Sequence, residues 1–111
     1  QHSLPAMMEL ANKWYFTAEK VIDLMCHKPA ELFQIQKRGY IRKGYYADLV
    51  LLKPEKWEVN KSNILYKCRW SPFEGEIFNY KVIQTIINGK TVFHNNKITP
   101  QQTAMPLVFN R

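Results

Sequence analysis

The stretch between Gly44 and Pro54 constrains the fold more than any other part of the chain. Four consecutive apolar residues, 49–52, lie between these two breakers. Glycine adopts positive φ without steric cost, whereas proline lacks the N–H that a strand ladder needs. A short, unbroken apolar run between turn signals is typical of a strand that is buried on both faces. We therefore predict a buried strand that ends at Pro54.

A helical pattern precedes this strand. Ser3 and Thr17 are suitable N-cap residues, and apolar residues recur at helical spacing behind each of them. Pro29 is expected to stop the second helix and to begin a short third one over residues 30–33. The first 43 residues are thus predicted to be helices and a connecting loop.

The pattern changes to β-structure behind the strand. Asn88-Gly89 separates the β-rich stretches 80–87 and 90–94, and Asn-Gly is the preferred turn of a two-residue hairpin. Three weaker signals are an alternating stretch at 56–59, a turn at 95–96 and an apolar stretch at 107–109. These patterns predict one hairpin, one buried strand and short edge strands.

The predicted strands are too few for a self-contained sheet. An isolated hairpin is marginal in water, and the apolar run at 49–52 needs cover on both faces. We interpret the chain as an α+β piece of a larger fold, with the missing strands outside it. Exposed strand edges of such a piece favour self-association, so a free-standing assembly domain is one alternative.

The charge balance allows a second alternative. The chain has 16 Lys and Arg against 9 Asp and Glu, a formal net charge of +7. Four aromatic residues could stack on bases, namely Tyr45, Tyr46, Trp57 and Trp70. The basic residues are scattered rather than gathered, however, and packing is the default role of aromatic side chains. We therefore expect solvated basic surface, with a nucleic-acid-binding module as the alternative.

The sequence gives few signs of secretion or of membrane insertion. No apolar run approaches the ~20 residues that a membrane helix needs, and no secretion leader is visible. Cys26 and Cys68 are far apart and follow no disulfide framework. A cytoplasmic protein without membrane contact is the expectation.

The residues that could hold a metal do not form a recognisable site. The candidates are His2, His27, His94, Cys26 and Cys68. Zinc sites usually show paired ligands at short spacing, and this chain has no such pair. Cys26 is expected to be a buried thiol beside a helix-end His27, and His94 a surface residue. Only His2, ahead of the first helix, has a claim to line a pocket, so no metal ligand is predicted.

Catalytic residues are equally hard to find. Ser71 lies in a loop without a G-x-S-x-G elbow, and no phosphate-binding glycine loop is present. Asp48 stands beside the buried strand, where a carboxylate needs partners, and capping a turn is its expected role. Chemistry alone therefore predicts no catalytic residue.

Several stretches together resemble a known family. They are SLPAM at 3–7, MCHKPAELF at 25–33, ADLV at 47–50, KCRWSPFEG at 67–75 and TIINGKTVF at 85–93. As a set they resemble the C-terminal part of dihydroorotases of the hydantoinase-like type, within the metal-dependent amidohydrolases. The loop at 67–75 and the hairpin carry most of the specificity. Allantoinases and dihydropyrimidinases, which differ there, are the related alternatives.

The resemblance implies a fold. Family members combine a (β/α)₈ barrel with a small β-sandwich that both chain ends build. Residues 1–43 would then be the last barrel helices with a connecting loop, and residues 44–111 the C-terminal part of the composite sandwich. The expected partner is the remainder of the parent chain.

It also implies a chemistry. Dihydroorotases interconvert N-carbamoyl-L-aspartate and L-dihydroorotate in pyrimidine synthesis, with two zinc ions bridged by a carboxylated lysine and an activated hydroxide. The family's H-x-H pair is not in this sequence. No metal or catalytic residue is therefore carried over, no cofactor is expected here, and this piece alone is expected to be inactive. His2 would lie next to the family's substrate-contacting loop.

Overall fold

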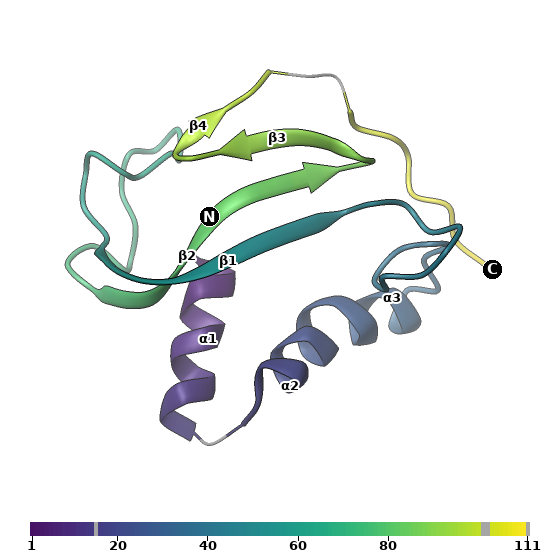
Figure 1. Ribbon diagram of the computed structural model, residues 1–111, viewed down its shortest axis with the longest axis horizontal. Coiled ribbons are helices and arrows are strands. Elements are labelled where there is room, and N and C mark those ends of the chain that lie inside the picture. The colour runs from purple at the N-terminus through teal and green to yellow at the C-terminus, as the bar shows by residue number, and fades with distance from the viewer. Residues whose placement is uncertain (15, 101–102, 111) are drawn as a thin grey trace.

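The computed structural model describes residues 1–14, 16–100 and 103–110 (Figure 1). The helical elements are α1 (Ser3–Trp14), α2 (Ala18–Ile22), the π-helix η1 (Asp23–His27) and α3 (Lys28–Leu32). The strands are β1 (Leu49–Glu58), β2 (Ile77–Ile87), β3 (Lys90–His94) and β4 (Lys97–Ile98). All described pairings are antiparallel, in the order β1-β2-β3-β4. The α+β class predicted from the sequence is confirmed.

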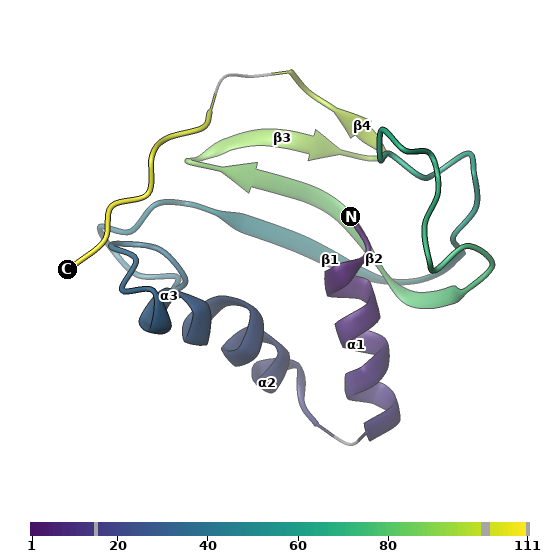
Figure 2. The ribbon, with the colours of Figure 1, turned by 180° about the vertical axis from the view of Figure 1, so that it is seen from behind.

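The helices cover the sheet unevenly. In both views α1 meets the sheet at β2, and the rod from α2 to α3 runs back from the far end of α1 (Figures 1 and 2). Met8 and Ala11 of α1 form one buried cluster with Val21, and Leu52 and Tyr80 of the sheet pack against it. The amphipathic pattern of α1 thus positions the first helix on the sheet.

The second helix begins as its sequence indicates. The Oγ1 of Thr17 accepts a hydrogen bond from the Lys20 backbone N–H at 3.3 Å, which confirms the predicted N-cap. The prediction that Pro29 stops this helix is wrong. The helix continues through η1 into α3, and Pro29 lies in the first turn of α3, as the sequence also indicates.

The prediction that the first strand ends at Pro54 is also wrong. β1 runs through Pro54, includes most of the alternating stretch at 56–59, and contains a bulge between Pro54 and Trp57. The strand lies at the edge of the described sheet, where proline is tolerated because half of the N–H groups point away from the neighbouring strand. Val50 and Leu51 are 47% and 39% exposed, so burial on both faces is not reached within this chain.

The hairpin is where the sequence places it. Asn88 and Gly89 both have positive φ, at 49° and 78°, as a type I′ turn requires. The turn at Asn95-Asn96 joins β3 to β4. In place of the strand expected at 107–109, a single bridge pairs Phe109 with Ile35.

The accessible surface of the described chain is larger than that expected for a compact, independently folded domain of the same mass. Its accessible surface is 8364 Å², whereas a folded monomer of 13.2 kDa is expected to expose about 6,400 Å². Its radius of gyration is 15.1 Å against about 13 Å expected. Burial is divided between two small clusters instead of one core. Among the described residues, none of the helices has the length and apolar character to cross a membrane.

Candidate functional site

His2 is the predicted pocket residue, and it lies in the interior of an aromatic cluster. It is 1% exposed. Four rings lie around it at centroid distances of 5.4–6.4 Å, those of Trp57, Tyr66, Phe73 and Phe78. The buried residues Val59 and Ile64 complete the cluster with Phe78. Because the loop over residues 59–76 supplies most of these groups, the loop and the start of α1 form one packed unit.

One polar contact crosses this cluster. The Nδ1 of His2 lies 3.0 Å from the Oγ of Ser71, and that oxygen also accepts the Phe73 backbone N–H at 3.2 Å. The His2 backbone N–H donates to the Tyr66 hydroxyl at 3.2 Å. Within the described residues, the buried Nε2 of His2 has no hydrogen-bond partner. The contacts tie the loop to α1 across nearly 70 residues of chain.

Burial sets the charge of this histidine. Desolvation, and secondarily the nearby terminal ammonium, lowers the pKa of His2 below 6.5, so the ring is neutral at pH 7. A neutral imidazole beside a serine has the elements of a nucleophile–base pair. The pair is buried, however, since Ser71 is only 5% exposed. Its arrangement suits holding the loop better than attacking a substrate.

The other metal candidates lie apart. His27 stacks on Tyr40 with ring centroids 4.1 Å apart, and His94 is exposed, as expected. The expectation that Cys26 is buried is wrong, because Cys26 lies in η1 at an exposed position. No group of three or more His, Cys, Asp or Glu among the described residues could hold a metal ion. The donors of these residues do not fit a zinc centre.

Asp48 caps a turn, as predicted. One carboxylate oxygen accepts the Asn88 backbone N–H at 2.8 Å, and the other pairs with the Arg38 guanidinium. The guanidinium also donates to the Asn88 side chain at 3.0 Å. Asp48 therefore fixes the β2–β3 turn against the entry of β1.

The aromatic residues considered for base stacking differ in their surroundings. Trp57 belongs to the cluster around His2 and donates its indole N–H to the Tyr80 carbonyl at 2.8 Å. Tyr46 is covered by the Arg38 guanidinium, 4.3 Å from its ring centroid. Trp70 is exposed. Tyr45 lies edge-on to Tyr40 with ring centroids 6.5 Å apart. Packing is thus confirmed for Trp57.

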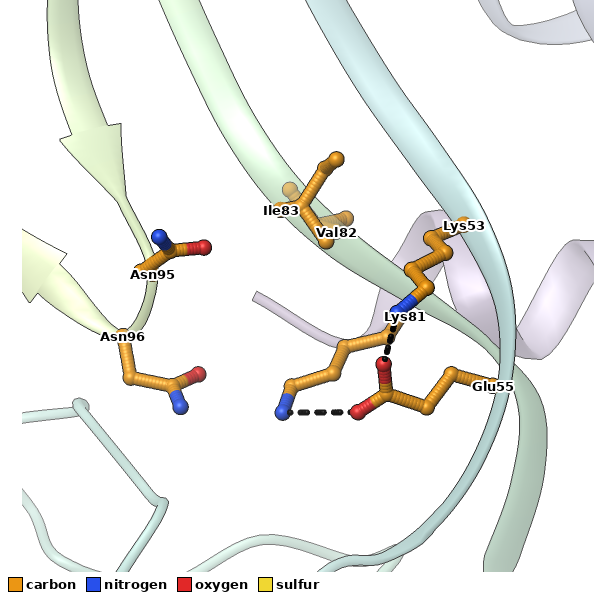
Figure 3. Close-up of a pocket in the computed structure, with 7 residues that line it drawn as sticks. All are labelled: Lys53, Glu55, Lys81, Val82, Ile83, Asn95 and Asn96. Atoms are coloured by element: carbon orange, nitrogen blue, oxygen red, sulfur yellow. Dashed lines mark hydrogen bonds and ion pairs between the residues drawn. The ribbon is translucent and has the colours of Figure 1, made fainter.

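A cavity that the sequence did not indicate lies on the sheet (Figure 3). It has a volume of about 400 Å³, and its lining is Lys53, Glu55, Lys81, Val82, Ile83, Asn95 and Asn96. Lys53 and Lys81 are directly opposed in the β1–β2 register. The bulge in β1 brings Glu55 between them, with ion pairs of 3.0 Å and 3.3 Å. Only the strand register brings these residues together, so their sequence spacing gave no signal.

Comparisons with known proteins agree with the fold. The model of the amidohydrolase family matches residues 2–92. The dihydroorotase of Sulfurihydrogenibium sp. is 35% identical over 86% of this chain, and that of Halobacterium salinarum is 30% identical over 87%. The solved L-hydantoinase (dihydropyrimidinase) of Arthrobacter aurescens superposes with a TM-score of 0.72 at 28% identity, over 84% of this chain and 21% of that one. The chain spans 22% and 23% of the two dihydroorotases, less than a quarter of their length.

Proposed function

Because this chain belongs to the amidohydrolase family, we propose that it is the C-terminal portion of a dihydroorotase. The proposed parent interconverts N-carbamoyl-L-aspartate and L-dihydroorotate in pyrimidine synthesis, in the cytoplasm. This portion has a structural role and is inactive alone. Residues 1–43 are proposed as the last helices of the barrel and its connecting loop, and residues 44–111 as the C-terminal share of the β-sandwich.

The observation that carries the proposal is the excess surface. The chain exposes about 30% more area than a finished domain of its mass. Part of the exposed apolar area lies on the helical rod, where Leu24, Leu32 and Phe33 line a groove of about 600 Å³. Large exposed apolar patches mark interaction surfaces. The remainder of the family chain is the proposed occupant.

The edge of the sheet supports the same conclusion. β1 has ten residues and pairs with β2 on one side; on its other side no strand among the described residues pairs with it. Such a long open edge invites another strand. The N-terminal share of a composite sandwich would close it, and self-association through this edge is proposed for the isolated chain.

The chemistry is assigned to the rest of the parent. Zinc-activated hydroxide is proposed as the nucleophile on the family resemblance, and the donors described in this chain do not fit that metal. No step is therefore attributed to its residues. The contribution we propose for this chain is the support of the active-site end by the unit that joins α1 to the loop at 59–76.

The first test is the coding sequence that precedes the codon of Gln1. An H-x-H motif after a first predicted strand, in the same reading frame, is the expected result. A stop codon or an unrelated domain there would refute the proposal. The complete gene product should then be assayed with L-dihydroorotate, allantoin and dihydrouracil, and preference for either of the last two would favour the allantoinase or dihydropyrimidinase alternative.

The isolated chain gives the second test. Purified and supplied with zinc, it should hydrolyse no L-dihydroorotate. Measurable turnover would contradict the proposal that its role is structural. Binding to generic DNA that weakens steeply with salt would instead support the nucleic-acid alternative.

A further inference from the structure

The cavity on the sheet has unbalanced charge. Lysines directly opposed on adjacent strands repel each other, and Glu55 offsets this by pairing with both. The two ammonium groups hold the pKa of the Glu55 carboxyl below its usual value, so it stays ionised at neutral pH. Two positive charges against one negative leave one positive charge in the cavity. We propose that this cavity binds a small organic oxyanion, a compound with a carboxylate or phosphate group.

One neutral hydrogen-bonding side chain, that of Asn96, faces Lys81, whereas the side-chain amide of Asn95 contacts His94 Nε2 at 3.0 Å. Asn95 and Asn96 form the β3–β4 turn with φ of 46° and 65°, and the Asn95 backbone N–H donates to the Ile83 carbonyl at 3.0 Å. That bond fixes the turn against β2. Figure 3 shows the side chain of Asn96 and the ammonium of Lys81 on opposite sides of the same open space. An oxyanion between them could accept from an ammonium and an amide together, the stronger bond being the charged one.

The lining of the cavity is partly apolar. Val82 and Ile83, which follow Lys81 on β2, add apolar side chains to the lining. A second cavity of about 120 Å³ shares Lys81, Val82 and Asn96 with the first, and its lining includes Trp57 and Phe93. A few convergent polar groups beside an apolar surface are typical of small-molecule sites. The oxyanion would therefore bind at Lys81 and Asn96, with a compact apolar portion toward the aromatic residues.

Lys81 and Lys53 differ in their exposure to solvent and in their distance from Glu55. The side chain of Lys81 is 26% exposed, against 58% for Lys53. Its contact with Glu55 is also the longer of the two, at 3.3 Å. A more buried ammonium with a longer ion pair gives up less solvation and less pairing on binding an anion, so Lys81 is assigned the main contact and Lys53 the role of retaining Glu55.

The test is a titration of the ¹⁵N-labelled chain, followed by NMR, with inorganic phosphate, acetate and benzoate at constant ionic strength. The backbone and side-chain amides of Asn95 and Asn96 should shift and saturate. Stronger binding of phosphate would identify the phosphate form, and stronger binding of benzoate a carboxylate with an apolar portion. Shifts that do not saturate with any of the three would refute the site.

Three variants show which charged side chain is responsible for binding the anion. Lys81→Gln should weaken binding about tenfold, the size of one charged hydrogen bond. Lys56→Gln, an equal charge change on an exposed residue outside the cavity lining, should weaken it less than about twofold. Glu55→Gln should strengthen binding, because both ammonium groups lose their partner. Equal weakening by both lysine variants would show general screening and refute the proposal.

Discussion

Two regions of this chain contain similar apolar residues and differ in what covers them. Around His2, the start of α1, the loop at 59–76 and β2 enclose one another, and Phe78 is 4% exposed. On the rod from α2 to α3, Leu32 and Phe33 are 75% and 58% exposed. Both regions lie within the match to the amidohydrolase family. The difference in burial shows that this chain covers its own apolar side chains around His2 and leaves those on the rod exposed.

The physical reason is the location of the facing element. α1 and β2 are about 70 residues apart, yet both belong to this chain, so their apolar faces meet and aromatic rings close the gap. The rod has a groove of about 600 Å³ with no described segment in it. Comparable hydrophobic residues therefore contribute to stability in one region and remain available for contact in the other.

The largest effect is expected from removing a phenyl ring in the enclosed region. Phe78→Ala should lower the free energy of unfolding by about 3–5 kcal/mol, because it deletes a buried ring beside Trp57 and Phe73 and leaves a cavity. Urea unfolding followed by circular dichroism measures the change.

The matched control is the same substitution on the rod. Phe33→Ala should change the free energy of unfolding by less than about 0.5 kcal/mol, since the ring is already solvated. Equal losses in the two variants would show that the rod packs against something in this chain, and the contrast between the regions would then be wrong.

The second prediction concerns the pH dependence of the free energy of unfolding. Because burial holds the pKa of His2 below 6.5, the unfolded chain binds a proton at higher pH than the folded one. Between pH 6.5 and that lower value the unfolded state carries more protons, so stability falls as the pH falls. The slope from this one group is at most about 1.4 kcal/mol per pH unit. Urea unfolding at several pH values between 7.5 and 5 measures it.

Two variants isolate the contribution of His2. His2→Phe keeps a ring in the cluster and removes the titrating group, so the slope in this window should decrease whatever the absolute stability. His94→Gln, at an exposed position, should leave the slope unchanged. A slope that survives in His2→Phe would assign the acid sensitivity to other groups.

A smaller loss is expected where the hairpin turn meets β1. Asp48→Ala removes the acceptor of the Asn88 N–H and the partner of Arg38, whose side chain is only 13% exposed. The free energy of unfolding should fall by about 1–2 kcal/mol. Asp23→Ala, which breaks a surface pair with Lys20, should cost less than about 0.5 kcal/mol. Thermal unfolding of both variants tests the difference, and equal shifts would contradict the assigned capping role.

Local signals predicted a large part of the fold. Thr17 and the Asn88-Gly89 turn have specific backbone requirements, so short sequences were enough to place a helix start and a hairpin. Asp48 was also assigned correctly, since a carboxylate beside a strand needs donors. The enclosed position of His2 was not predicted; the sequence indicated a pocket residue, and the chain order gives no sign that Ser71 approaches it.

The errors occurred where tertiary context decides. Pro54 was expected to end a strand, but an edge position and a bulge accommodate it. Pro29 was expected to end one helix and to begin the next; it does lie in the first turn of α3, but the helix continues into α3 through η1 without a break. The cavity between Lys53, Glu55 and Lys81 depends on strand register, which no spacing in the sequence specifies. The strand end and the cavity depend on neighbours that are distant in sequence, whereas the helix continues past Pro29 through the adjacent turn η1.

The smallest effect on stability should come from the rod. Leu32→Ser replaces a side chain that is 75% exposed, so the free energy of unfolding should change by less than about 0.5 kcal/mol. If the groove is a contact surface, the same change should still weaken association with whatever covers it. Sedimentation of the isolated chain at rising concentration separates two routes of self-association. Association through the open edge of β1 should persist in Leu32→Ser, whereas association through the groove should be weakened, because only the groove loses apolar area.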